Sequence, residues 1–170
     1  KGLREELQKV PSVATVFTIL DAPLLNISDL PFEEMIKDIP SLEKPGIDRD
    51  KAKKELLNSP IYRELIVSAD GQTAAILLEL ADNQQYASLL RSRDELRNKQ
   101  RDIGLSVRER QLLDRTSAAF DKAHEELSRE RHQVVAQVRE IIKPYRQHGL
   151  LYLGALPMIT DDMVTFVRND

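Results

Sequence analysis

Three histidines are the first residues whose chemistry could support catalysis or metal binding: His124, His132 and His148. His124 lies in the stretch AHEEL, which begins like the zinc-binding motif H-E-x-x-H. That motif needs a second histidine four residues after the first, on the same helix face, but residue 128 is Ser. His124 and His132 are separated by about two helical turns and have charged neighbours, so we interpret them as exposed residues of a helix surface.

Asp161 and Asp162 are adjacent carboxylates, a pattern that could serve acid–base chemistry or bind a cation. They follow Thr160 at the start of a predicted helix, where acidic side chains interact favourably with the helix dipole, so we interpret them as capping. The sequence has no glycine-rich phosphate loop, and the serines at 12, 28 and 59 lie in no G-x-S-x-G motif. These patterns predict a protein that is not an enzyme, with no catalytic, cofactor-binding or metal-binding residues.

The composition excludes several other kinds of protein. The 170 residues include no cysteine, which excludes disulfides, cysteine-based zinc sites and thiol chemistry. The net charge of −3 provides no overall basic field for nucleic acid. The longest uninterrupted apolar stretch, 74–78, is far shorter than the roughly 18 residues of a membrane span. With 41% hydrophobic and 5% aromatic residues, the chain can bury a core and leans toward helix.

The first part of the chain alternates between short helices and strands. A helix is predicted at 3–10 from the spacing of its apolar residues, and the β-branched run at 13–20 is typical of a buried strand. Asp48 is a favourable N-cap for a helix that extends through Leu57. A short helical piece is also expected around Phe32.

A two-stranded hairpin is predicted around Asp70-Gly71. Apolar runs at 64–69 and 72–80 flank this dipeptide, which favours the positive φ angles of a two-residue type I′ turn. Such hairpins occur in proteins of many kinds, so this element says nothing about function.

Residues 82–148 predict a long antiparallel helical hairpin, because apolar residues recur there at a spacing of seven. The two series are Leu89, Leu96 and Ile103, then Leu113, Phe120, Leu127, Val134 and Ile141. The positions that alternate with the second series are small or polar, so we expect the arms to pack on each other rather than form a parallel dimer. The segment has 14 basic and 11 acidic residues, a mixture typical of a solvated helical surface.

The ends of the two arms are also marked. Gly104 suits a helix C-terminus, and Ser106 with Glu109 forms an S-x-x-E capping box. The arms would contain about 18 and 37 residues, and Pro144 would end or kink the longer one. The apolar stripe widens from Val134 onward, so we expect that part to dock on a sheet and the rest to project.

These elements together predict an α+β fold with a ferredoxin-like, split βαβ core. A strand at 150–155 and a helix from Thr160 would complete the order, with one further strand expected before Lys1 and beside 13–20. The core would comprise 1–81 and 149–170, and the helical hairpin would be an insertion at 82–148. We therefore expect the sequence to be a segment of a longer polypeptide.

Three stretches, in this order, resemble one protein family. VATVFTILDAPLL (13–25), SPIYRELIVSADGQTAAILLEL (59–80) and LYLGALPMITDDMVTFVRND (151–170) resemble the extracytoplasmic loop of resistance-nodulation-division (RND) exporters, in the MMPL-like branch. The second shows the S-x-D-G pattern of that branch, and the third its G-x-P-x-I-x-x-D-M pattern. The helical insertion departs from the simplest members, which puts in doubt any transfer of substrate pathway or assembly.

The resemblance implies a proton-driven transporter of the bacterial inner membrane, with this segment on the periplasmic side. Its proton-relay residues would lie in transmembrane helices of the parent polypeptide, outside this segment. The expected partners are those helices, further protomers of a homo-oligomer, and a lipid or other hydrophobic cargo, with no nucleic acid. The alternative is an interaction module, unrelated to transport, that presents the helical hairpin to a protein partner.

Overall fold

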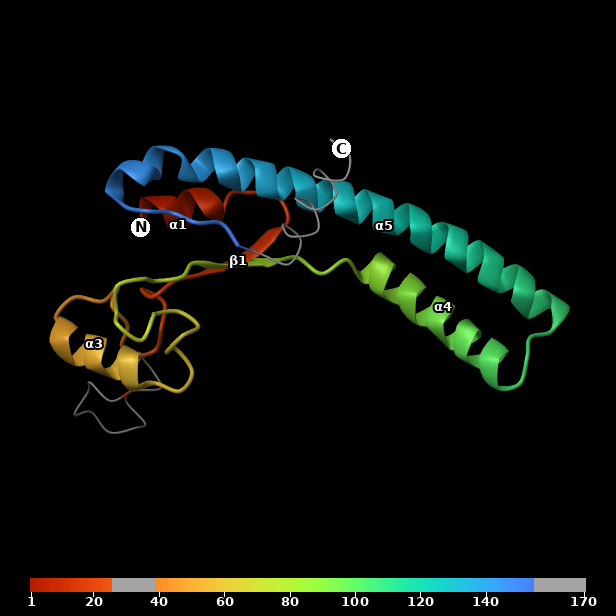
Figure 1. The fold of residues 1–170 in the computed structure, drawn as a ribbon, viewed down its shortest axis with the longest axis horizontal. Helices are drawn as coiled ribbons and strands as arrows, with labels where there is room; N and C mark the ends of the chain where they lie inside the picture. The colour runs from red at the N-terminus through yellow and green to blue at the C-terminus, as the bar shows by residue number, and fades with distance from the viewer. Residues whose placement is uncertain (26–38, 155–170) are drawn as a thin grey trace. The chain divides into compact units, whose positions relative to one another are not determined.

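The computed structural model of the chain describes residues 1–25 and 39–154 (Figure 1). It divides into two compact units, Lys1–Leu80 and Ala81–Asp170. The described elements are helices and a two-stranded antiparallel sheet. The predicted mixture of helix and strand is therefore confirmed. The helix pieces expected around Phe32 and after Thr160 lie outside the described residues.

The first unit begins with helix α1 (Gly2–Leu7) and strand β1 (Val13–Phe17), close to their predicted positions. The Gln8 side chain holds them together, because its amide nitrogen donates to the Ala14 carbonyl and its amide oxygen accepts from the Val16 N–H. Leu7 and Val16 are buried, whereas the turn between the two elements includes Ser12 with a φ of +67°.

β1 pairs antiparallel with β2 (Leu77–Leu80), from Val13 opposite Leu80 to Phe17 opposite Leu77. Within the described ranges this is a sheet of two strands, so the finer prediction of a split βαβ core stays a prediction. The prediction of a strand at 150–155 is wrong for the described residues 150–154, which form no strand. Leu150 and Tyr152 are 86% and 88% exposed there, since this run has no partner strand in the described chain to cover it.

The turn at Asp70-Gly71 differs from the predicted two-residue type I′ turn. That turn needs a positive φ at both residues, and only Gly71 has one, at +67°. The Asp70 carboxylate instead accepts from the Ser68 hydroxyl and the Gln72 N–H, and these hydrogen bonds lower the pKa of that carboxyl. The Gly71 N–H donates to the Ser68 carbonyl, and the Ser68 N–H donates to the Thr73 carbonyl. Local side chains thus widen the turn, and 64–69 forms isolated bridges rather than a strand.

Helix α3 (Arg49–Asn58) lies between the two strands in sequence and covers the core of the first unit. Asp48 caps it as predicted, because its carboxylate accepts from the N–H groups of residues 50 and 51. Leu56 is 2% exposed and faces the buried cluster. That cluster consists of Ala22, Leu24, Ala52, Leu56 and Val67, with Leu57 packed against it.

The second unit is a helical hairpin formed by α4 (Gln84–Asp102) and α5 (Val107–Ile142). The arms have 19 and 36 residues and would extend over roughly 28 and 54 Å at 1.5 Å per residue. The predicted capping box is present between Ser106 and Glu109, and Gly104 adopts a φ of +81° at the turn. α5 ends before Pro144 as predicted, and the 3-10 helix η1 (Pro144–His148) follows.

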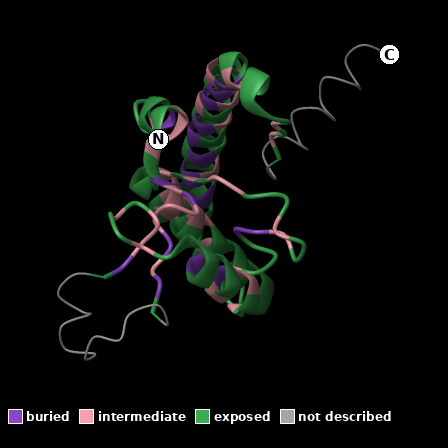
Figure 2. Cartoon of the chain, turned by 90° about the vertical axis from the view of Figure 1, so that its left-hand side faces the viewer, coloured by how far each residue is buried: buried purple, intermediate pink, exposed green. Residues whose placement is uncertain are grey.

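Buried residues recur along the length of α5 (Figure 2). They are Leu113, Thr116, Phe120, Ala123, Leu127, Val134, Val138 and Ile142. The buried positions follow the predicted series to Val134 and then reach Ile142 instead of Ile141. A helix of 3.6 residues per turn drifts by about 20° per heptad from a repeat of seven, so over four heptads its inward face moves by nearly one residue.

We expect the helical hairpin to lose stability as the pH falls from about 4.5 to about 2. Hydrogen bonds from Lys99 and from Ser106 lower the pKa of the Glu109 carboxyl from its usual 4.5 to about 2. A lowered folded-state pKa contributes stability that is present above the unfolded-state value and is lost as the pH falls through the folded-state value. In the Glu109→Gln variant, this loss of stability at low pH should be absent. The free energy of unfolding is measured at several pH values by urea titration followed by far-ultraviolet circular dichroism.

The matched control is Glu95→Gln, which removes an exposed carboxylate from α4. The Glu95 variant should keep the pH dependence of the unsubstituted protein. If the stability of the Glu109 variant and that of the unsubstituted protein depend equally on pH over this range, the Glu109 carboxyl is not the source of the effect.

Candidate functional site

The first unit carries an open groove along α3 that is the best candidate for a binding site. Its volume is about 530 Å³. Two of its apolar side chains, Leu25 and Ile61, are 52% and 65% exposed, so the groove presents apolar surface to solvent. We call it the α3 groove; it is lined by Pro23, Leu25, Lys51, Lys54, Glu55, Asn58, Ser59, Pro60, Ile61 and Tyr62.

Hydrogen bonds in the C-terminal half of α3 and just after it hold the walls of the groove in place. One carboxylate oxygen of Glu55 accepts from the Leu25 N–H at 2.6 Å, which ties the segment after β1 to the helix. The Ser59 hydroxyl accepts from the N–H groups of Ile61 and Tyr62 at 3.2 and 3.3 Å, which turns the chain after α3 back along it. The exposed apolar side chains therefore stand on backbone that is fixed by side-chain hydrogen bonds.

The groove combines this apolar surface with two exposed cations, Lys51 and Lys54. The Tyr62 hydroxyl is partly buried, and burial, followed by the nearby Glu55 charge, raises the pKa of Tyr62. Tyr62 is therefore a neutral hydrogen-bond donor near neutral pH. Such a lining could bind a molecule that is largely apolar and carries an acidic or polar end.

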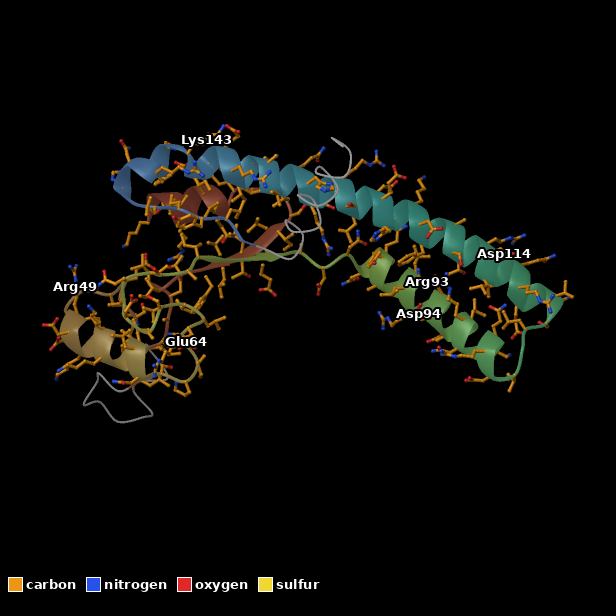
Figure 3. The ribbon with its side chains drawn as sticks, in the orientation of Figure 1. Arg49, Glu64, Arg93, Asp94, Asp114 and Lys143 are labelled. Carbon is orange, nitrogen blue, oxygen red and sulfur yellow. The ribbon has the colours of Figure 1, made fainter. Side chains whose placement is uncertain are left out.

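A second gathering of side chains lies between the helices of the second unit. The Phe120 ring is 5.1 Å from that of Tyr86 and 5.9 Å from that of His124, measured between centroids. Arg93 projects from α4 toward α5 (Figure 3), and its guanidinium carbon lies 3.7 Å from the Phe120 centroid. This cation–π contact and the ring contacts hold the two helices together.

The structure places the residues that the sequence singled out in separate parts of the chain. His124, His132 and His148 are all exposed, in agreement with the prediction for His124 and His132. The Tyr86 hydroxyl oxygen lies 3.4 Å from Nδ1 of His124, so this histidine belongs to the aromatic contacts. Asp161 and Asp162 lie outside the described residues.

Residues 1–25 and 39–154 contain no group of three histidine, aspartate or glutamate side chains arranged to hold a metal ion. None of the helices in these ranges has the length and apolar character needed to span a membrane.

Sequence reasoning missed the α3 groove because its lining comes from two segments, 23–25 and 51–62, that are far apart in the sequence. Each segment is ordinary by itself, since a proline, a leucine or a lysine on a helix surface is no signal. No signal in the sequence marks these positions, because Leu24 and Leu25 both follow Pro23 and only the structure shows that Leu24 is buried and Leu25 is exposed.

The comparisons with known proteins identify no relative. The chain matches no protein-family model, no curated protein sequence and no solved structure.

Proposed function

We propose that this chain is the periplasmic domain of a proton-driven inner-membrane exporter of the RND superfamily, in its MMPL-like branch. In this role it has no catalytic chemistry. It contributes part of the substrate path and the contacts between protomers, and its core is of the ferredoxin-like, split βαβ type. The cargo is a lipid or another hydrophobic molecule.

The observation that carries this proposal is where two of the three resembling stretches lie. The stretch 13–25 contains β1 and the stretch 59–80 contains β2, and these strands pair with each other. Segments that resemble one family at separate places in the sequence therefore form one sheet. An antiparallel pair of this kind is compatible with the proposed core.

The α3 groove supports the assignment of a hydrophobic cargo. Pro23 and Leu25 lie at the end of the first stretch, and the segment from Ser59 to Tyr62 begins the second, so these two stretches supply six of the ten residues that line the groove. Its exposed Leu25 and Ile61 can cover apolar parts of a cargo molecule. The lysines on α3 can attract an acidic end of that molecule.

Cysteine labelling of the full-length parent protein tests whether this segment lies on the periplasmic side of the inner membrane. The chain has no cysteine, so Leu112→Cys introduces a single thiol here, at a position on α5 that is 52% exposed. In a parent protein without other cysteines, we expect a membrane-impermeant maleimide to label this thiol in spheroplasts with an intact inner membrane. Labelling is measured by the mass shift of the purified protein.

Leu65→Cys is the matched position in the first unit, because Leu65 is 55% exposed. It should be labelled to a similar extent before and after lysis. If both thiols react only after the cells are lysed, the segment is on the cytoplasmic side and the exporter proposal is wrong. The interaction module that presents a helical hairpin would then be the better account.

A further inference from the structure

The turn that joins α4 to α5 exposes two large apolar side chains. Ile103 is 80% exposed and Val107 is 73% exposed, on either side of a turn that contains Gly104. Leu105, between them, is 9% exposed and fills the end of the hairpin instead. Packing within the hairpin therefore explains the apolar character of Leu105 but not that of Ile103 or Val107.

Basic residues flank these two side chains in the sequence. We call residues 97–110 the hairpin tip; its charged residues are Arg97, Lys99, Arg101, Asp102, Arg108, Glu109 and Arg110. Both acidic residues are paired within the tip, Glu109 with Lys99 and Asp102 with Arg101. An excess of three positive charges remains, and the arginines at 97, 108 and 110 are exposed.

The size of the apolar surface decides which kind of partner fits the tip. A stable protein interface buries about 800 Å² on each partner around an apolar core, which two side chains at a turn cannot supply. Binding to an anionic lipid surface needs less apolar area, because a few apolar side chains enter the headgroup region while basic residues contact the phosphates. The excess positive charge of the tip complements such a surface.

We propose that the hairpin tip binds the surface of an anionic lipid bilayer, with Ile103 and Val107 inserted between the headgroups and the arginines at 97, 108 and 110 against the phosphates. This inference goes beyond the exporter proposal and does not depend on it. Binding of the tip requires no transport, and a transporter domain requires no such tip.

Cosedimentation of the 170-residue chain with lipid vesicles tests the inference. We expect binding to vesicles of phosphatidylcholine mixed with phosphatidylglycerol, weak binding to phosphatidylcholine alone, and a loss of affinity as salt is added. The double variant Ile103→Ser, Val107→Ser should bind at least about tenfold more weakly, because it removes the inserted surface. Arg108→Gln, Arg110→Gln should lose about fivefold for each charge.

Matched variants separate the tip from the rest of the chain. Leu65→Ser, Leu150→Ser removes two exposed apolar side chains elsewhere, and Arg91→Gln, Arg146→Gln removes two exposed cations outside the tip. Both should bind the mixed vesicles like the unsubstituted protein. Thermal melts followed by circular dichroism verify that every variant is folded.

Three outcomes would overturn the inference. The first is no binding to the phosphatidylglycerol vesicles, and the second is equal binding by the tip variants and their controls. The third is self-association in sedimentation velocity that disappears in Ile103→Ser, Val107→Ser while vesicles are not bound. That last result would assign the tip to contact with a second copy of the chain.

Discussion

Replacing Phe120 by alanine is expected to destabilise the helical hairpin by about 3–5 kcal/mol. Phe120 is 8% exposed and contacts the Tyr86 ring and the Arg93 guanidinium, both of which lie on the other helix. The substitution removes the largest apolar side chain on the buried face of α5 and leaves a cavity between the helices. The free energy of unfolding is measured by urea titration followed by far-ultraviolet circular dichroism.

Two further variants serve as comparisons for Phe120→Ala. Phe120→Leu keeps an apolar side chain but loses the ring contacts, so it should cost less than the alanine variant. Leu112→Ala removes an apolar side chain that is 52% exposed on the same helix and should change stability by no more than about 0.5 kcal/mol. A Phe120→Ala effect as small as that of Leu112→Ala would show that the two helices do not depend on this contact.

Leu56→Ala is expected to destabilise the first unit by about 2–5 kcal/mol. The Leu56 side chain is 2% exposed and packs among Leu24, Ala52 and Val67, so its removal leaves a cavity beneath α3. Because α3 also forms a wall of the α3 groove, the variant should loosen that wall. Hydrogen exchange of the amides of α3 and β1, measured by mass spectrometry, reports the change in the free energy of opening.

The matched control is Leu65→Ala, since Leu65 is 55% exposed. It should leave exchange in α3 unchanged. If exchange in α3 and β1 is the same in Leu56→Ala as in the unsubstituted protein, the cluster around Leu56 is not the core that stabilises this unit.

The signals that cap or end α3 and α5 act within a few residues and were predicted correctly, whereas the type I′ turn at Asp70-Gly71 was not. Asp48 caps α3, and Ser106 and Glu109 cap α5, because each cap is made by a side chain and N–H groups two or three residues away. Pro144 likewise ends α5 because its ring disfavours helix at the residue before it. Such contacts form wherever the local backbone becomes helical, whatever the rest of the fold.

Predictions that extended a pattern over a longer distance were less accurate. Ile103 was the third member of an apolar series on α4, yet it is 80% exposed because the helix ends at Asp102 and Leu105 fills the end of the hairpin. The apolar run that begins at Leu150 has the composition of a strand but forms none through Gly154, and Leu150 and Tyr152 remain exposed. A strand needs a neighbouring strand as well as suitable residues, and no single run of sequence contains that neighbour.

The sequence by itself determined the N-caps of α3 and α5 and the end of α5 before Pro144, and it predicted that residues 82–148 form two helices that pack on each other. The tertiary structure decided which residues meet across longer separations. Pairing of β1 with β2 joins residues 60 or more apart in sequence, and the α3 groove combines two segments, 23–25 and 51–62. Contacts of that kind depend on where whole elements pack, which is set by the burial of many side chains together rather than by any local run.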